Sequence, residues 1–304
     1  MFADDTFGLK SDHDLISLIN SLNVDINKMA IWFKANKLAV NKTKTKFMIF
    51  RTKGKKVPII IPPLLFDENE PNLPHDPQKI TELERYHDKH EKIEGRAYKL
   101  LGIYLDEHLS LDVHVNHIIS KLTRSLYCIR MAKNNLNYCG LRSLYFALIH
   151  SHLSYCPTIL SCLSISNKNK ISKIQKKALR VMTQSNYNAH TLPLFISHKI
   201  LPFEKILKQG KLNFMHSIYY NYAPNSFENI WVKNEERLGD YNLRNDNLFM
   251  LPLPRIELFK CLTFYSLPSE WNSAGELIYY ENKITFKHAL REKLFEELVT
   301  ELES

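Results

Sequence analysis

The spacing of apolar residues changes at about residue 106, and this change limits the folds that the chain can adopt. Before it, short apolar runs bounded by turn-forming residues predict strands over 47–50, 57–61 and 100–105. After it, apolar residues recur every three or four positions, which predicts helices over 115–129, 141–148, 171–182, 203–222 and 284–300. A strand-rich segment followed by helices indicates the α+β class.

Three further elements are predicted in the first hundred residues. Apolar residues at steps of three and four predict an amphipathic helix over 15–33, with Ser11 as its cap. The first nine residues resemble a tight β-hairpin with Asp4 and Asp5 at the turn. An acidic, proline-containing stretch follows the early strands, and we expect a loop there with a short helix over 80–92.

Positive charge is concentrated in one part of the chain. The total is 41 Lys and Arg against 32 Asp and Glu, but residues 96–210 carry 16 basic and 4 acidic side chains. Between Val113 and Phe203 there are twelve Lys or Arg and no acid. A solvated helical surface normally mixes both signs, so this pattern favours a surface that contacts nucleic-acid phosphates. The alternative is a basic surface face that arose by chance.

Several function classes are excluded early. Only eight residues are glycine, and the closest pair, Gly95 and Gly102, cannot form a dinucleotide-binding or P-loop motif. The most apolar stretch, 144–163, is interrupted by His, Ser and Pro, which argues against a membrane partner. Five cysteines without a C-x-x-C pair, and no signal peptide at Met1, predict reduced, mostly buried thiols. We therefore expect a nuclear or cytoplasmic protein that is not secreted.

The sharpest local motif is Phe2-Ala3-Asp4-Asp5. Two adjacent carboxylates offer hard oxygen ligands that Mg²⁺ prefers, and two such ions could support nucleotidyl transfer. The alternative is purely conformational, because Asp is common in turns.

The order of the following motifs resembles a known family. Residues 32–50 read W-F-K-A-N-K-L-A-V-N-K-T-K-T-K-F-M-I-F, and residues 98–106 read Y-K-L-L-G-I-Y-L-D. This order is similar to that of reverse transcriptases of non-LTR retrotransposons of the jockey and CR1 type. In that family an aromatic-Ala-Asp-Asp hairpin precedes an L-x-x-N-x-x-K-T motif and then a K-x-L-G-x-x-x-D hairpin.

The resemblance continues to the end of the chain. The segments H-V-N-H-I-I-S-K-L-T-R-S-L, L-R-S-L-Y-F-A-L-I-H-S-H-L-S-Y-C and K-I-Q-K-K-A-L-R-V-M resemble the helices of the family's thumb. Trp271-Asn272 and Phe286-Lys287 resemble its W-N…F-K closing segment. The resemblance implies a partial antiparallel palm sheet with helices over 1–110, a basic all-α thumb over 111–185 and a helical extension over 186–304.

The resemblance also implies roles for individual residues. Asp4 and Asp5 would be the catalytic, metal-binding carboxylates, and Lys44 would lie beside the incoming nucleotide. Leu101 and Gly102 would form the primer grip, where glycine allows close backbone approach. The phosphates of an RNA template and of an RNA–DNA or DNA duplex would be contacted by Lys121, Arg124, Arg130, Lys173, Lys176, Lys177 and Arg180.

The family's polymerase also needs a third Asp on an earlier palm strand, and fingers, both upstream of the catalytic hairpin. We therefore expect this chain to be a polymerase fragment that binds Mg²⁺ weakly or not at all and has no polymerase activity alone. A polymerase or endonuclease segment of the same element would be its partner. The alternative function is a non-catalytic nucleic-acid-binding relic that uses the basic helices.

Two weaker patterns have competing interpretations. His114 and His117 are spaced to hold a metal on one helix face, although a position near phosphates or solvent is the simpler expectation. Tyr219, Tyr220 and Tyr222 could stack on bases or pack into a core.

Overall fold

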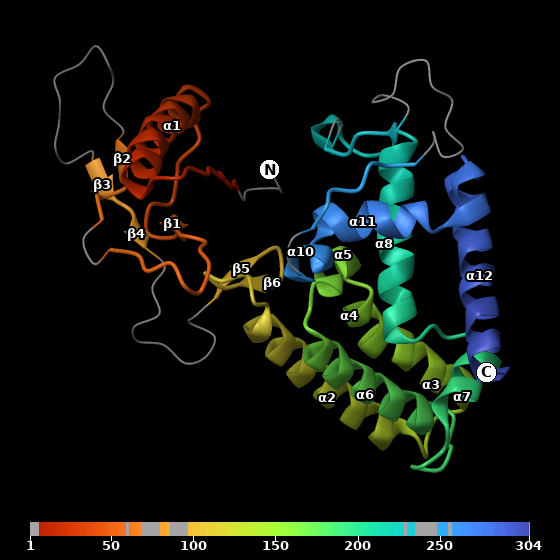
Figure 1. Cartoon of the computed structure of the whole chain (residues 1–304). Coiled ribbons are helices and arrows are strands. Elements are labelled where there is room, and N and C mark those ends of the chain that lie inside the picture. The colour runs from red at the N-terminus through yellow and green to blue at the C-terminus, as the bar shows by residue number, and fades with distance from the viewer. Residues whose placement is uncertain are drawn as a thin grey trace. The chain divides into compact units, whose positions relative to one another are not determined.

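The computed structural model describes residues 6–58, 61–67, 80–85, 97–227, 230–234, 248–254 and 257–303. Asp4 and Asp5 lie outside these ranges. The chain divides into two compact units, which we call the N-terminal unit (Met1–Val113) and the C-terminal unit (His114–Ser304). Each unit is described by itself below (Figure 1).

The N-terminal unit combines one long helix with short strand pairs. Its elements are α1 (Leu15–Ala35), β1 (Lys46–Phe47), β2 (Leu65–Asp67), β3 (Ile80–Glu82), β4 (Glu84–Arg85), β5 (Tyr98–Leu100) and β6 (Ile103–Leu105). Strands β2 and β3 pair antiparallel, as do β5 and β6, whereas β1 and β4 pair parallel. The described residues therefore contain three separate two-stranded sheets.

Helix α1 and strand β2 form the core of this unit. Ile19 of α1 and Phe66 of β2 are buried together with Leu64 and Leu83. Asn23 joins the two elements, since its side-chain amide donates to the Pro63 carbonyl at 3.1 Å and accepts from the Leu65 amide at 2.8 Å. This amide therefore satisfies backbone groups next to β2 that would otherwise lack partners.

The hairpin of β5 and β6 is built around a two-residue turn. Leu100 pairs with Ile103, and the intervening Leu101 and Gly102 have φ of 46° and 88°. Two consecutive residues in the left-handed region match the turn geometry that twisted hairpins favour. After β6, the Asp106 carboxylate accepts from the Ser110 amide at 2.7 Å and the Ser110 hydroxyl at 2.9 Å, which fixes the turn into the next helix.

The C-terminal unit is helical in its described residues. Its helices are α2 (Asp112–Ala132), α3 (Tyr138–Tyr145), α4 (Ser151–Leu153), α5 (Pro157–Ser161), α6 (Ile165–Met182), α7 (Thr191–Ser197), α8 (Phe203–Tyr219), α10 (Glu257–Cys261), α11 (Thr263–Asn272) and α12 (Lys283–Glu303). A π-helical segment (Phe146–His150) follows α3, and short 3₁₀ turns cover Asn225–Phe227 and Gly275–Tyr279.

A buried glutamine links three parts of this unit. Gln175 of α6 is 1% exposed. Its amide nitrogen donates to the Tyr145 hydroxyl at 3.0 Å and to the Leu201 carbonyl at 2.9 Å. Its carbonyl oxygen accepts from the Phe203 amide at 2.7 Å, at the first residue of α8. Every polar atom of this side chain thus has a partner, which fixes α3, α6 and the start of α8 relative to one another.

Aromatic rings surround the buried His216 of α8. The His216 ring stacks on Phe286 at 4.2 Å between centroids, and Trp271 lies at 6.3 Å. Tyr219 packs on Trp271 at 5.2 Å between centroids, which confirms the core interpretation for this tyrosine. Asn272 holds residue 249 through both backbone groups, at 3.0 Å and 2.7 Å. The Trp271-Asn272 and Phe286 motif residues therefore build a core.

The helices predicted from apolar spacing are confirmed, but several predictions about the first hundred residues are wrong. Residues 6–9 form no strand, since none of the described residues pairs with them. The cap of α1 is Asp14, whose carboxylate accepts from the Ser17 amide at 2.8 Å, so Ser11 is not the cap.

The strand predictions need further correction. The strand predicted over 47–50 is only Lys46–Phe47. Of the strand predicted over 57–61, residues 57, 58 and 61 form no strand and residues 59 and 60 lie outside the described ranges, and the next strand is Leu65–Asp67. Residues 80–85 of the predicted helix form β3 and β4, and residues 86–92 lie outside the described ranges. The apolar run over 100–105 predicted one strand, whereas the motif resemblance implied a hairpin. The structure has a hairpin, because positive φ at Leu101 and Gly102 reverses the chain.

Two predictions about buried and exposed groups are also wrong. His114 is 3% exposed, not solvated, because it lies on the apolar side of α2. None of the five free cysteines is fully buried: Cys128, Cys139 and Cys261 are exposed, and the other two are half-buried.

The coarse fold class is mixed α+β, as expected. No helix among the described residues is long and apolar enough to span a membrane.

Candidate nucleic-acid interface

Helix α6 separates its cations from its buried face. At about 100° per residue, five of its six Lys and Arg side chains fall within an arc of about 120°. The buried residues Ile171, Ala178 and Met182 lie on the opposite side. The cations in this arc are Lys170, Lys173, Lys176, Lys177 and Arg180. The helix thus presents a continuous positive surface.

These cations lack acidic partners. None of the six Lys and Arg residues of α6 forms an ion pair with a residue that the structure describes. Lys170 instead donates to the Asn167 side chain at 3.2 Å, and the Arg180 guanidinium donates to the Ala189 carbonyl at 2.9 Å. The charge on α6 is therefore not neutralised within the described protein.

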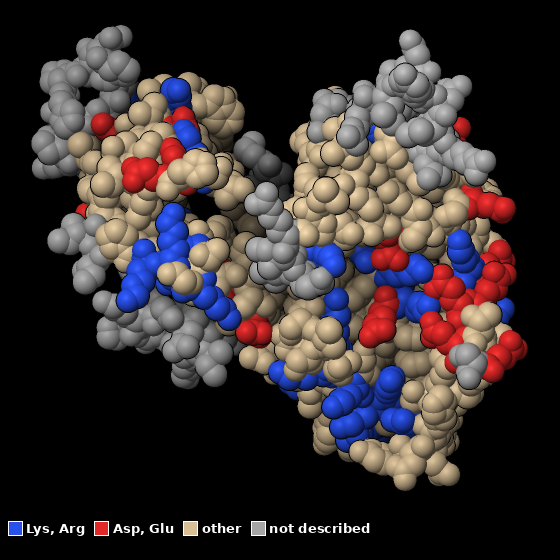
Figure 2. Space-filling model, viewed as in Figure 1, with Lys and Arg blue, Asp and Glu red and all other residues tan. Residues whose placement is uncertain are grey.

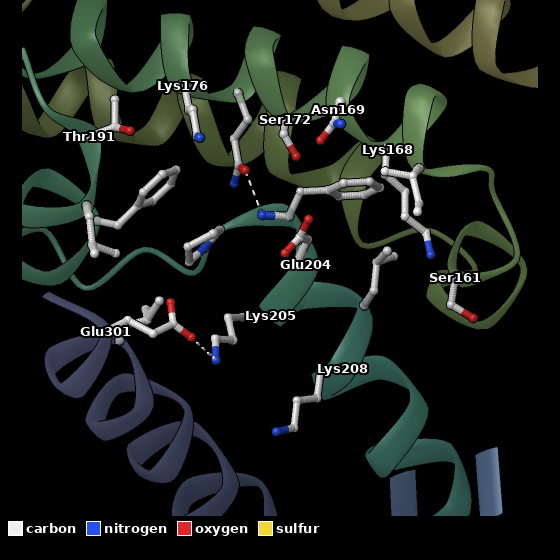
Figure 3. A pocket seen from close by; sticks show the side chains of 18 of the residues that line it. Ser161, Lys168, Asn169, Ser172, Lys176, Thr191, Glu204, Lys205, Lys208 and Glu301 are labelled. Atoms are coloured by element: carbon white, nitrogen blue, oxygen red, sulfur yellow. Dashed lines mark hydrogen bonds and ion pairs between the residues drawn. The ribbon is translucent and has the colours of Figure 1, made fainter. Parts of the chain in front are cut away.

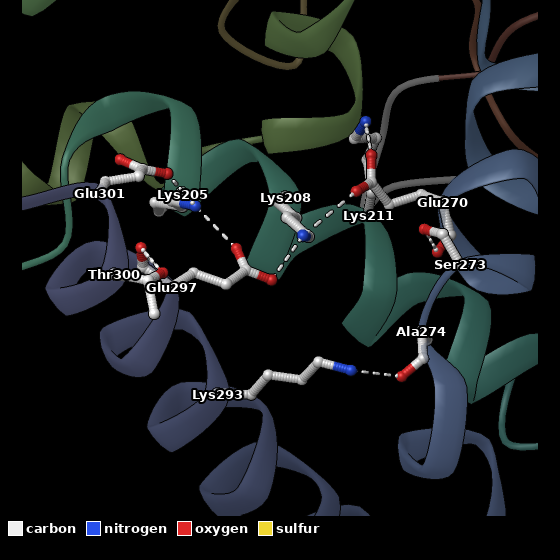
Figure 4. A network of polar contacts seen from close by, with 10 residues as sticks. All are labelled: Lys205, Lys208, Lys211, Glu270, Ser273, Ala274, Lys293, Glu297, Thr300 and Glu301. Carbon is white, nitrogen blue, oxygen red and sulfur yellow. Dashed lines mark hydrogen bonds and ion pairs between the residues drawn. The ribbon is translucent and has the colours of Figure 1, made fainter. Parts of the chain in front are cut away.

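The lysines of α8 behave differently (Figure 4). Lys205 contacts Glu297 at 2.6 Å and Glu301 at 2.8 Å, and Lys208 contacts Glu297 at 2.8 Å. Lys211 pairs with Glu270 of α11. We call these six residues the α8 ion-pair ladder. It uses acidic side chains of the last third of the chain to neutralise α8.

The ladder shifts the ionisation of its members in the expected directions. Partial burial opposes the charge of Lys205, but hydrogen bonds to Glu297 and Glu301 outweigh it and raise the lysine's pKa. Burial likewise disfavours the charged form of Glu297, yet its bonds to Lys205 and Lys208 lower the carboxyl pKa. Both shifts favour the charged forms, so the ladder is stable at neutral pH.

The surface follows this division of charge. Figure 2 shows Lys and Arg gathered on the side of the C-terminal unit formed by α2 and α6, and Asp and Glu gathered along α12. Sequence composition located the basic segment, but it gave no means of separating the paired lysines of α8 from the unpaired ones of α6.

The predicted cations of α2 do not share one face. Lys121 and Arg124 lie on one flank of the buried stripe that contains Leu122 and Leu126, whereas Arg130 lies on the other flank. Lys121 is half-buried, and the other two are exposed. Arg124 donates to the Ser120 carbonyl at 3.3 Å. A single ligand surface can therefore include only part of this predicted set.

Two exposed aromatic side chains accompany the cations and were missed in the sequence. Tyr127 is 62% exposed and lies between Arg124 and Arg130 in the sequence of α2. Tyr187 is 73% exposed in the loop after α6, two residues before the carbonyl that Arg180 contacts. Exposed aromatic rings beside cations suit stacking on bases. Their occurrence within the acid-free segment was the sequence feature that could have identified them as candidate base-stacking residues.

A pocket of about 710 Å³ opens between α6, α7, α8 and α12 (Figure 3). Its α6 wall includes Lys168, Asn169, Ser172 and Lys176, and its α8 wall includes the ladder lysines. Lys176, predicted as a duplex contact, therefore lines this pocket, whereas Lys173 and Lys177 do not. Sequence reasoning did not find the pocket, because its walls are far apart in the chain.

The predicted polymerase residues are not brought together by described contacts. Lys44 is exposed in a turn in which its amide donates to Asn41. Leu101 and Gly102 are exposed at the tip of the β5–β6 hairpin. The magnesium prediction rests on Asp4 and Asp5, which lie outside the described residues. Among the residues that the structure describes, no group of three or more His, Cys, Asp or Glu is placed to hold a metal.

Comparison with protein-family models, curated proteins and solved structures finds no match. The similarity to reverse transcriptases therefore rests on the sequence motifs alone.

Proposed function

We propose that the C-terminal unit binds a nucleic-acid duplex through the outer face of α6. The observation that carries this proposal is the row of α6 cations without an acidic partner in the described structure. Each such cation can release condensed counterions when it contacts a phosphate. A helical surface of this kind contacts the backbone and senses duplex shape, without reading base edges.

The main alternative is an ordinary solvated basic face. The distribution of acidic residues within the same unit argues against this alternative. Residues 211–304 contain 14 acidic side chains, of which Glu270, Glu297 and Glu301 form the ladder with α8. Acids are therefore present in the fold, yet none that is described pairs with α6. This selective absence favours an external anion.

Replacing Lys173 and Lys177 with glutamine is expected to weaken binding of an RNA–DNA hybrid about tenfold or more, since two phosphate contacts are lost. The slope of log affinity against log salt should become shallower by about 2. Fluorescence anisotropy with a labelled hybrid at a series of salt concentrations measures both quantities.

A matched control is the double change Lys283→Gln and Lys287→Gln. These exposed lysines lie on α12, and their replacement removes the same amount of charge. The control should bind the hybrid as the unchanged chain does. Binding that is absent, that does not depend on salt, or that falls equally in both double variants contradicts the proposal.

A second candidate function is a fragment of an RNA-directed DNA polymerase from a mobile element, as the motif order implies. The observation in its favour is the exposed two-residue tip at Leu101 and Gly102, whose tight turn suits a primer grip. In this proposal the N-terminal unit is part of a palm and the basic helices are a thumb.

We expect no primer extension on a poly(A) template. Extension above that of an Asp4→Ala/Asp5→Ala variant contradicts this expectation.

A further inference from the structure

The pocket between α6 and α8 has one wall whose polar groups are not used by the described protein. Lys168, Ser172 and Lys176 recur every four residues and therefore line the same side of α6, with Asn169 beside them. The two lysines form no ion pair with a described residue, and the Ser172 and Asn169 side chains hydrogen-bond to none. In Figure 3 the Lys176 and Ser172 side chains extend from α6 toward the pocket.

This wall offers the groups that bind phosphate oxygens. Ammonium, hydroxyl and amide groups all donate hydrogen bonds, and two positive charges favour an anion. They are arranged along about two turns of one rigid helix, so little side-chain freedom beyond the lysines must be lost on binding. The α8 wall cannot compete for the same anion, because the ladder already pairs its lysines with carboxylates.

One of the three carboxylates that line the pocket limits the kinds of ligand that can bind there. Glu204 of α8 lines the pocket and forms no ion pair with a described residue. Figure 3 shows it between the α6 wall and the α8 lysines. An ionised carboxylate accepts hydrogen bonds only. The Glu204 carboxylate repels an anion and so disfavours free phosphate or an acidic peptide, whereas hydroxyl or amino donors beside a ligand's phosphate would hydrogen-bond to it.

Part of the pocket wall is apolar. Leu192, Pro202 and Leu207 are among the side chains that line it. A pocket of several hundred Å³ in which apolar side chains lie beside polar groups has room for a small ligand. The sugar and base of a nucleotide could pack on these apolar side chains while its phosphate contacts α6.

We propose that this pocket binds a nucleotide unit, with its phosphate held by Lys168, Ser172 and Lys176 and its hydroxyl or amino donors directed to Glu204. This inference goes beyond duplex binding, because it uses the pocket side of α6 and a different ligand. It does not depend on whether the outer face binds a duplex.

The test uses the whole chain and the four ribonucleoside 5′-monophosphates, with inorganic phosphate as a separate probe. Saturation-transfer NMR reports which of them bind, and titration gives their affinities. We expect the nucleotides to bind more tightly than phosphate. The double variant Lys168→Gln/Lys176→Gln should lose nucleotide affinity at least tenfold, while Lys173→Gln/Lys177→Gln on the outer face retains it.

The variant Glu204→Gln separates a nucleotide site from a general anion site. It should weaken nucleotide binding severalfold and leave phosphate binding unchanged or stronger. Nucleotide binding that is absent, or that is equal in both lysine double variants, overturns the proposal. Tighter nucleotide binding in Glu204→Gln overturns it as well. If the hybrid fails to bind while nucleotides bind as described, the proposed duplex function is wrong and this inference stands.

Discussion

Replacing Gln175 with leucine is expected to lower the free energy of unfolding of the C-terminal unit by about 3–5 kcal/mol, because three buried groups lose their partners. These groups are the Tyr145 hydroxyl, the Leu201 carbonyl and the Phe203 amide. Leucine preserves most of the side-chain volume, so the loss reports hydrogen bonding more than a cavity. Burial raises the pKa of Tyr145 to about 12, so its hydroxyl remains protonated and needs a partner at any pH of interest.

Urea denaturation followed by circular dichroism measures this loss. The control Lys177→Leu places the same side chain on the exposed face of α6, where we expect a change within about 0.5 kcal/mol. If Gln175→Leu is as stable as that control, the glutamine does not hold the three segments together, and the start of α8 must be positioned by apolar packing alone.

Gln175 also shows what apolar spacing misses. The pattern placed Ile171, Ala178 and Met182 on the buried face of α6, and the structure confirms them. Gln175 lies four residues after Ile171 and so falls on the same face, but a polar residue at such a position adds nothing to an apolar pattern. Its three partners come from distant segments, so the sequence alone could not identify them.

The short strands were harder to predict than the helices for a physical reason. A helix of 18 or 21 residues repeats its apolar spacing several times, whereas strands such as β1 contain only two or three residues. Their positions depend on partner strands elsewhere in the chain. The hairpin tip at Leu101-Gly102 carried a recognisable turn signal in its glycine, but the apolar run around it predicted one continuous strand.

The sequence indicates which segment is basic, but it does not indicate which of the basic side chains are paired with acids. The acid-free segment between Val113 and Phe203 includes α6 and could be recognised because its charge pattern is local in the sequence. Separating unpaired α6 cations from the paired lysines of α8 required the contacts of Lys205 with Glu297 and Glu301, more than ninety residues away. The pocket depends on the same long-range packing.

Acidification is expected to destabilise the C-terminal unit well before its carboxylates are protonated. Burial, with smaller contributions from His117 and Lys121, lowers the pKa of His114 to about 4 from an ordinary value of 6.5. Between these values the unfolded chain binds a proton that the folded chain does not. The stabilising contribution is therefore complete above pH 6.5 and decreases as the pH falls toward 4.

The expected loss from His114 is about 2 kcal/mol at pH 5 and about 3 kcal/mol in full, at about 1.4 kcal/mol per pKa unit. His216 adds to it in the same direction. Burial lowers its pKa despite hydrogen bonds to Tyr280 and Glu281 that raise it. One ring nitrogen, Nε2, lies 2.8 Å from the Tyr280 carbonyl, so it carries the proton of the neutral ring. The other, Nδ1, is buried without a partner among the described residues, so a second proton there would be unsatisfied.

Urea unfolding at pH 7, 6 and 5 measures the effect, and His114→Gln should flatten the dependence because glutamine does not titrate. His288→Gln is the control, since the His288 side chain is 75% exposed on α12 and this variant should keep the slope of the unchanged chain. A slope that is identical in His114→Gln and in the unchanged chain contradicts the assignment to His114. A slope that persists in His114→Gln but disappears in His114→Gln/His216→Gln assigns it to the aromatic cluster around α8 instead.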